Sequence, residues 1–212
     1  MLEYIKKELD SKVDEVSNCK NYASVSIILS EIKNSINILF IERAERAGDP
    51  WSGDIAFPGG KGEFTDASKL ITAIRETKEE IGLDLYEKDC IGKLSNLSLE
   101  SSHNFSIFPY VFQKIKYGEF KLDIEEVADC FWVDLNNFLN ISNYYSTIEV
   151  FKGDKYTVPY IMLNNKKVWG ITYILLAELL IILVNSNKLE LKIENKDQLI
   201  KLWENSKWKL NE

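Results

Sequence analysis

The chain has 212 residues, and at roughly 150 residues per domain this length fits one domain with an added element or two. It carries 26 Lys and Arg against 33 Asp and Glu, a formal net charge of −7, which argues against nucleic acid or an anionic membrane as the main partner. Hydrophobic residues make up 45% of the chain and charged residues 28%, so there is enough apolar material for a sizeable core, and intrinsic disorder is excluded as the default.

Cysteine and histidine are sparse. The three cysteines are Cys19, Cys90 and Cys130, with no CxxC pair, and His103 is the single histidine. A structural zinc site is therefore not expected. Scattered, odd-numbered cysteines favour a reducing compartment, and the charged N-terminal residues lack the apolar stretch of a signal peptide, so we expect a cytoplasmic protein.

In the first part of the chain, apolar spacing predicts a helix and a hairpin. Residues 1–20 place apolar side chains three and four positions apart, which predicts a helix. Residues 23–29 and 36–41 read as two strands joined by a short turn. A Gly- and Pro-rich loop at 43–60 follows.

The next helix is expected at 67–81. Either Asp66 or Thr65 is a candidate N-cap, because both carry a side-chain oxygen that can accept from a first-turn N–H. Gly82 is a candidate stop.

The remaining chain is predicted to hold strands, one apolar helix and a mixed tail. In chain order these are strand-like segments at 91–99 and 105–112, an acidic loop at 123–129, a strand-like segment at 130–133, a loop or short helix end at 136–143, a strand pair within 153–163, an apolar helix at 170–184, and a strand and a short helix within 188–212. The apolar stretch 168–184 is shorter than the ~20 residues that span a bilayer, so we expect a buried helix and no membrane span. Strands occur in runs with interspersed helices, which favours an α/β (α+β) class with a mixed sheet and helices on its faces.

Three carboxylates share one side of the helix at 67–81. On a helical wheel, Glu76, Glu79 and Glu80 fall on an arc turned away from an apolar packing stripe. The stripe consists of Leu70, Ile74, Thr77 and Ile81. Such crowding has two readings: a solvated helix face, or a site for a hard divalent cation such as Mg²⁺ or Mn²⁺.

A glycine turn precedes this helix. Gly59 and Gly60 follow Phe57 and Pro58, and glycine lets a backbone come close to a ligand and aim its N–H groups at an anion. The GxxxxGK[ST] pattern of a P-loop is absent, so the P-loop nucleotide-binding reading is set aside. A glycine loop feeding an acidic helix is instead suited to holding a metal–diphosphate complex.

At these residues the sequence resembles the Nudix hydrolase family. The family signature is Gly, five residues, Glu, seven residues, Arg-Glu, an aliphatic residue, any residue, Glu-Glu, any residue, Gly and an aliphatic residue. Here Gly60 is followed by Asp66 at the first Glu position, by eight residues in place of seven, and by 75–83 (RETKEEIGL) with Thr77 at the aliphatic position. These variations, together with the GDIAFPGG approach, look like the coenzyme A diphosphatase-like branch, although 49–52 (DPWS) stands where that branch usually has a second Arg and a His.

The resemblance implies a fold and a catalytic apparatus. The implied fold is an α/β/α sandwich with a mixed sheet between helices, in a single domain over 1–212 whose core covers about 24–184, flanked by the N-terminal helix 1–20 and a C-terminal extension 185–212. The implied cofactor is Mg²⁺ or Mn²⁺, with its ligands Glu76, Glu79, Glu80 and the backbone of Gly60.

The resemblance also implies roles at the acidic centre. Arg75 would orient the glutamates through an ion pair, and one helical turn separates it from Glu79, the spacing of an i,i+4 pair. Glu79 or Glu80 would position the attacking water, and a carboxylate of the acidic loop, Glu125 or Glu126, is a second candidate base.

Four further residues are candidate substrate contacts, each with a plainer alternative. Arg43 and Arg46 could grip a phosphate or be simple surface arginines. Trp51 could stack on a base or pack under its loop. His103 could contact substrate or bond to nearby backbone.

The expected activity is metal-dependent hydrolysis of a phosphoanhydride bond in a small nucleoside diphosphate-linked substrate. Coenzyme A, ADP-ribose-like compounds, nucleoside tri- or diphosphates and isoprenyl diphosphates remain open. The alternative of another class is a non-catalytic Nudix-fold module that binds a nucleotide, and such a module would be expected to lack one or more of the glutamates. The apolar N-terminal stripe and the apolar helix also suggest surface for a homodimer.

Overall fold

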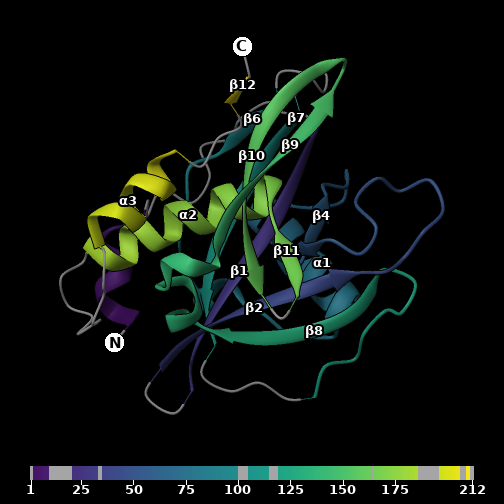
Figure 1. Ribbon diagram of the computed structural model, residues 1–212. Coiled ribbons are helices and arrows are strands. Elements are labelled where there is room, and N and C mark those ends of the chain that lie inside the picture. The colour runs from purple at the N-terminus through teal and green to yellow at the C-terminus, as the bar shows by residue number, and fades with distance from the viewer. Residues whose placement is uncertain are drawn as a thin grey trace. The chain divides into compact units, whose positions relative to one another are not determined.

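The computed structural model describes residues 2–9, 21–32, 35–99, 105–114, 119–163, 165–185, 196–205 and 209–210. These residues form two compact units, Met1–Val133 and Asp134–Glu212 (Figure 1). The single domain expected over the whole chain stays a prediction.

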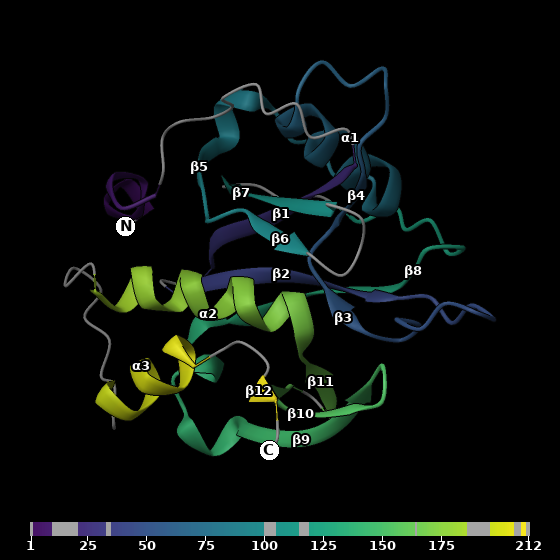
Figure 2. The same cartoon turned by 90° about the horizontal axis from the view of Figure 1, so that it is seen from above.

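The first unit is a mixed sheet with one long helix. Its elements in chain order are η1 (Leu2–Lys7), β1 (Tyr22–Ile32), β2 (Ser35–Arg43), β3 (Ile55–Ala56), β4 (Gly59–Lys61), α1 (Lys69–Ile81), η2 (Glu87–Asp89), β5 (Cys90–Lys93), β6 (Leu97–Leu99), β7 (Phe105–Gln113) and β8 (Val127–Asp134). The sheet order is β3-β2-β1-β7-β5, with β4 paired to β1, β6 to β7 and β8 to β2 (Figure 2). Because β1 and β7 run parallel while β1 and β2 run antiparallel, the predicted mixed sheet is confirmed.

The centre of the sheet is formed by β1, β2 and β7. The predicted hairpin is present, with Leu29 opposite Ile38. Both strands are buried along most of their central residues, the pattern of strands that are covered on both faces, although β1 contributes three buried serines, Ser24, Ser26 and Ser30. One face of β1 carries α1, which also lies against β4 and β7. Their shared core includes Ile28, Leu70 and Tyr110.

The ends of α1 are set by two residues. Ser68 is the N-cap, and its side chain accepts a hydrogen bond from the backbone N–H of Ile71. The predicted caps Asp66 and Thr65 are wrong, because the helix begins two residues later and the Asp66 carboxylate is occupied elsewhere. Gly82 ends the helix as predicted, with φ 70° and its N–H bonded to the Lys78 carbonyl.

The second unit combines a twisted β-hairpin with two helices. Its elements are η4 (Leu135–Phe138), η5 (Ile141–Asn143), β9 (Tyr144–Phe151), β10 (Asp154–Leu163), β11 (Lys166–Val168), α2 (Gly170–Asn185), α3 (Lys196–Glu204) and β12 (Lys209–Leu210). The predicted apolar helix is confirmed as α2, which packs with α3 and β10. Within the described ranges, no helix is both long enough and apolar enough to cross a membrane.

Several predicted boundaries differ from the structure. The strand pair within 153–163 is wrong, since β10 alone fills that range and pairs with β9 through a turn in which Lys152 and Gly153 have positive φ. The segment 91–99 splits into β5 and β6, and β8 begins inside the predicted acidic loop. The described part of the predicted helix 1–20 is the 3₁₀ helix η1, and the strand predicted near the start of 188–212 lies outside the described residues.

Candidate functional site

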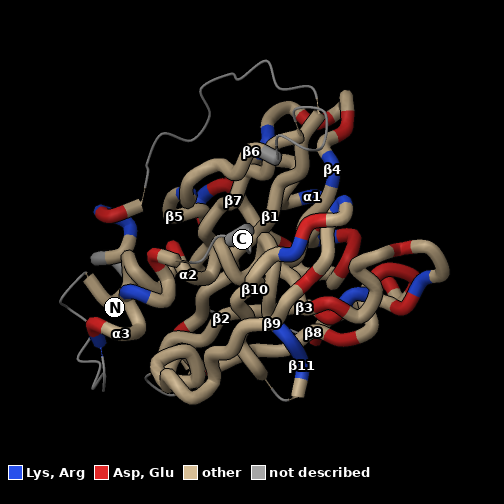
Figure 3. The backbone as a smooth tube through the Cα atoms, turned by 45° about the horizontal axis from the view of Figure 1, so that its top comes forward, with Lys and Arg blue, Asp and Glu red and all other residues tan. Residues whose placement is uncertain are grey.

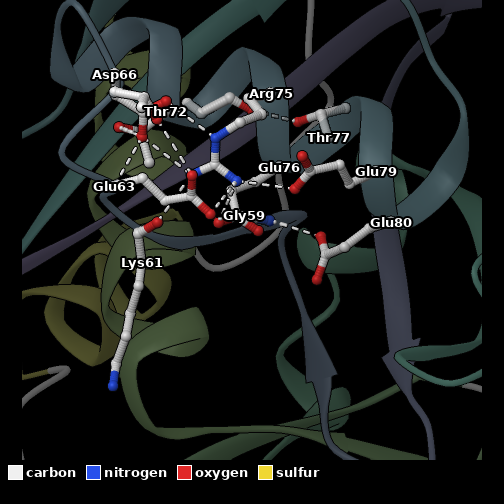
Figure 4. A network of polar contacts seen from close by, with 12 residues as sticks. Gly59, Lys61, Glu63, Asp66, Thr72, Arg75, Glu76, Thr77, Glu79 and Glu80 are labelled. Carbon is white, nitrogen blue, oxygen red and sulfur yellow. Dashed lines mark hydrogen bonds and ion pairs between the residues drawn. The ribbon is translucent and has the colours of Figure 1, made fainter.

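A buried carboxylate lies between α1 and the glycine turn. The Glu80 residue is only 3% exposed, and one of its carboxylate oxygens accepts a hydrogen bond of 2.8 Å from the Gly59 N–H (Figure 4). Burial raises the pKa of Glu80 to about 8, and the negative charges of Glu76 and Glu126 act in the same direction. The Gly59 N–H and the charge of Arg43 oppose this shift.

A second carboxylate rests against the glycine turn. A Cβ added to Gly60 would lie 2.4 Å from Glu76 Oε2, so the missing side chain of this glycine is what makes room for the carboxylate. The Glu76 side chain is 14% exposed, and burial raises its pKa despite the neighbouring Arg75. Gly60 itself is fixed by β4, where it lies opposite Ser24 of β1.

Arg75 is the hub that holds the acidic residues in place (Figure 4). The predicted i,i+4 pair with Glu79 is confirmed at 2.8 Å, and the same nitrogen donates to Glu76 at 2.9 Å. Its other two nitrogens grip Asp66 in a bidentate pair at 2.9 and 3.0 Å, and one of them also donates to the Lys61 carbonyl. With five donor groups engaged, Arg75 has none left for a substrate.

Asp66 anchors this arginine from the loop before α1. Its side chain is 3% exposed and also accepts from the Thr72 hydroxyl at 2.8 Å and from the Glu63 backbone N–H. The pKa of Asp66 falls to about 2, mainly because Arg75 hydrogen-bonds to its charged form. The Thr72 contact has no signal in the sequence, since it depends on how the loop folds back over the helix.

The three helix carboxylates are less alike than the wheel predicts. Glu79 is 56% exposed at its side chain, whereas Glu80 is buried, so the expectation that all three turn away from the packed side is wrong for Glu80. The physical reason is that the glycine turn covers α1 on a second side. Across the described residues, no three acidic, His or Cys side chains converge closely enough to enclose a metal ion.

An acidic turn is fastened to the end of α1. The backbone N–H of Asp123 donates to the Glu80 carbonyl at 2.9 Å, and the turn closes through Glu126 N–H to the Asp123 carbonyl. Figure 3 shows acidic segments gathered around α1 and the start of β8. Of the two predicted loop carboxylates, Glu126 acts electrostatically on Glu76 and Glu80, whereas Glu125 contributes its backbone carbonyl to a hydrogen bond. The sequence alone does not show which of Glu125 and Glu126 directs its carboxylate charge at the site.

The predicted substrate contacts have different surroundings. Arg43 pairs with Asp49 at 2.7 Å and is one-third exposed at its side chain. Arg46 is tied to the acidic turn through the Glu125 carbonyl and the Glu126 carboxylate. Trp51 is 59% exposed, which contradicts packing under its loop, and His103 lies outside the described residues.

The donor chemistry suits a hard divalent cation. The Glu76 and Glu80 carboxylates lie beside the backbone of a glycine turn, and their pKa values are raised mainly by burial, which penalises the charged form that a bound cation would stabilise. Glu76, Glu79, Glu80 and the backbone of Gly60 stay predicted ligands of Mg²⁺ or Mn²⁺, and Glu126 is an additional acidic neighbour of Glu76 and Glu80.

Comparison with known proteins places the chain in a family. The family model described as NUDIX domain matches residues 20–151, and the chain belongs to this family. The protein of Yersinia pestis (strain Pestoides F) described as "Uncharacterized Nudix hydrolase NudL" is 32% identical over 128 residues, which are 60% of this chain and 63% of that protein. The match therefore spans less than two thirds of the relative's length.

Two solved structures share a more distant likeness. The NUDIX domain of Shewanella oneidensis NrtR complexed with ADP ribose gives a TM-score of 0.46 at 20% identity, covering 65% of this chain and 84% of that one. A MutT/nudix family protein from Enterococcus faecalis gives 0.49 at 15% identity, covering 78% and 64%. With both scores below 0.5, neither bears on substrate or mechanism.

Proposed function

We propose that this protein hydrolyses a phosphoanhydride bond in a nucleoside diphosphate-linked substrate, using Mg²⁺ or Mn²⁺ held by Glu76, Glu79, Glu80 and the backbone of Gly60. The observation that carries the proposal is the buried Glu80 carboxylate, packed on the Gly59 N–H beside the negative charges of Glu76 and Glu126. Buried like charges are costly unless a positive charge joins them. When bound, a divalent cation neutralises phosphate charge and activates water.

The side chains of the site can adapt to such a cation. Glu79 is more than half exposed, so it can turn away from Arg75 at little cost. Arg75 would remain in place, because its bidentate pair with Asp66 does not depend on the glutamates. Its role is to orient Glu76 and Glu79 without contacting substrate.

The water must lose a proton to one of the nearby carboxylates. Glu79 and Glu80 are candidates on the helix, and Glu126 is the candidate on the acidic turn, supported by its charge acting on Glu76 and Glu80. Of the two loop glutamates we favour Glu126, because its charge acts on Glu76 and Glu80, whereas Glu125 meets Arg46 through its backbone carbonyl.

Substrate recognition is proposed for the end of β2 and the loop that follows it. The exposed Trp51 indole offers a flat surface on which a nucleobase can stack, and Arg43 lies close enough to Glu80 to affect its pKa, a suitable place to meet a phosphate. Candidates are coenzyme A, ADP-ribose-like compounds, nucleoside tri- or diphosphates and isoprenyl diphosphates.

The test is hydrolysis of this panel, followed by separation and mass measurement of the products, because cleavage inside a diphosphate bridge gives two phosphomonoesters and no free phosphate. We expect turnover of at least one member with Mg²⁺ or Mn²⁺ and loss of turnover in EDTA. If no member is cleaved with either cation, the proposal fails, and the nucleotide-binding alternative is then measured by calorimetry on the same panel.

The cytoplasmic location and the homodimer expected from the sequence stay predictions. Light scattering coupled to size exclusion measures the oligomeric state directly.

A further inference from the structure

Arg46 is held by an unusually complete set of contacts for an exposed residue. Its backbone N–H donates to the Ser52 hydroxyl, which in turn donates to the Arg46 carbonyl, both at 2.9 Å. The Asp49 N–H donates to the same carbonyl at 3.2 Å. The backbone of Arg46 is thus fixed by its own loop before its side chain makes any contact.

The side chain of Arg46 reaches the acidic turn of 123–126. Its Nε donates to the Glu125 carbonyl, and its Nη2 lies 3.2 Å from Glu126 Oε1. A neighbouring backbone bond of 2.8 Å, from Ala44 N–H to the Glu126 carbonyl, joins the same two segments. The same turn is also bonded through the Asp123 N–H to the carbonyl of Glu80. The turn is therefore held between the loop after β2 and the end of α1.

Such a contact has little to do with overall stability. The Arg46 and Glu126 side chains are 42% and 46% exposed, and ion pairs at that exposure contribute little to the free energy of folding. The Arg46–Glu126 ion pair matters more for the position of the Glu126 side chain, because the negative charges of Glu76 and Glu80 would otherwise repel it.

We propose that Arg46 is a positioning residue that holds Glu126 beside the glutamates of α1, and that it does not bind the phosphates of the substrate. This inference rests on the proposed function for its catalytic meaning, but the positioning itself is a property of the free protein. This positioning requires a guanidinium group, since its Nε donates to the Glu125 carbonyl while its Nη2 donates to the Glu126 carboxylate.

The first test is amide hydrogen exchange in the full chain without cation or substrate. Arg46→Gln should speed exchange at Ala44 and Val127, whose N–H groups donate to the Glu126 and Asp123 carbonyls. The matched control is Lys114→Gln, which also removes a cation bonded to one backbone carbonyl and one carboxylate, those of Asp84 and Asp89. Exchange at Ala44 and Val127 that is equal in wild type and Arg46→Gln would overturn the proposal.

The second test is a double-mutant cycle read by Mn²⁺ calorimetry and by turnover of whichever panel member the wild type cleaves. We expect Arg46→Gln and Glu126→Gln each to weaken Mn²⁺ binding and lower kcat by about 10- to 100-fold, and the double variant to be no worse than Glu126→Gln alone. Arg46→Lys should recover only part of the loss.

Phosphate binding by Arg46 would give a different result. KM would rise with kcat and Mn²⁺ affinity unchanged, and the effects of Arg46→Gln and Glu126→Gln would multiply, which would overturn the positioning role. A wild type that cleaves no panel member, while Arg46→Gln still loosens Ala44 and Val127, would refute the proposed function and leave the positioning of Glu126 supported.

Discussion

At the scale of single residues, the site is a balance between one arginine and several carboxylates. Arg75 holds Asp66, Glu76 and Glu79 together, while the Glu80 carboxylate accepts a hydrogen bond from the backbone N–H of Gly59. The pKa of Asp66 is lowered by its hydrogen bonds to Arg75, whereas those of Glu76 and Glu80 are raised mainly by burial. The charge of Asp66 is fully compensated by Arg75 and its other hydrogen-bond donors, and the helix glutamates remain available to bind a cation.

Glu76→Gln should therefore separate activity from stability. We expect turnover to fall by about 100-fold or more, because a carboxylate ligand is lost where charge has to be neutralised. Stability should be unchanged or slightly higher, since the amide avoids the burial cost that raises the Glu76 pKa. The measurements are the rate of product formation from the cleaved panel member and urea unfolding, with the exposed Glu87→Gln as control. Wild-type turnover in Glu76→Gln would contradict the assignment.

Asp66→Asn should give a pH-dependent loss of stability. The folded-state pKa of about 2 lies below the ordinary 3.8, so the charged form stabilises the fold above about pH 4, and this contribution is lost as the pH falls towards 2. A shift of this size corresponds to about 2 kcal/mol at pH 7, and about half of it remains at pH 3.

Urea unfolding of wild type and Asp66→Asn at pH 7, 5 and 3 measures this effect. The exposed pair of Asp84 with Lys78 supplies the control Asp84→Asn, which should change little at any pH. A difference between wild type and Asp66→Asn that stays constant down to pH 3 would contradict the ion pair as its cause.

At the scale of elements, the glycine turn does two separable jobs. Gly59 has φ 149°, and a Cβ there would lie 2.3 Å from the Ser24 carbonyl oxygen, which belongs to the fixed backbone of β1. A Cβ at Gly60 would instead meet the end of the flexible Glu76 side chain. The absence of a side chain at Gly59 thus lets the turn pack closely on β1, and its absence at Gly60 leaves room for the Glu76 carboxylate.

The two alanine variants should differ accordingly. Gly59→Ala should lower the free energy of unfolding by more than 1 kcal/mol, because neither the strained φ nor the backbone contact can relax cheaply. Gly60→Ala should keep most of the stability but weaken Mn²⁺ binding, since Glu76 has to move. Urea unfolding and Mn²⁺ calorimetry on both variants check the contrast. Equal losses of stability would mean that the turn acts as one rigid piece.

How far the sequence predicts these elements depends on the range of the interactions. The β1–β2 hairpin and the end of α1 at Gly82 follow from local patterns and are confirmed. The start of α1 is mispredicted, because Asp is a favoured N-cap residue but the Asp66 carboxylate is engaged by Arg75 and does not cap the helix. The burial of Glu80 is mispredicted because a helical wheel carries no information on the turn that covers it.

At the scale of the whole molecule, cation binding should be visible as stability. A ligand that binds only the folded state at a hundred times its Kd adds about 2.7 kcal/mol. For a chain of this length that corresponds to a rise in Tm of roughly 5–10 °C for the transition of the unit containing α1. Scanning calorimetry with MnCl₂, against NaCl at equal ionic strength, measures the shift, and Glu76→Gln should lose most of it. An unchanged wild-type Tm would argue against cation binding.

The parallel pairing of β1 with β7 has a consequence for biosynthesis. Tyr22 lies opposite Ser106, so the first strand of the sheet leaves the ribosome long before its central neighbour is translated. Until then the nascent β1–β2 hairpin keeps one edge open, and closing the sheet requires a slow, long-range search. The sheet of this unit can therefore close only after α1 has been translated, and until then the glutamates belong to a partly folded chain whose open strand edge is prone to aggregation.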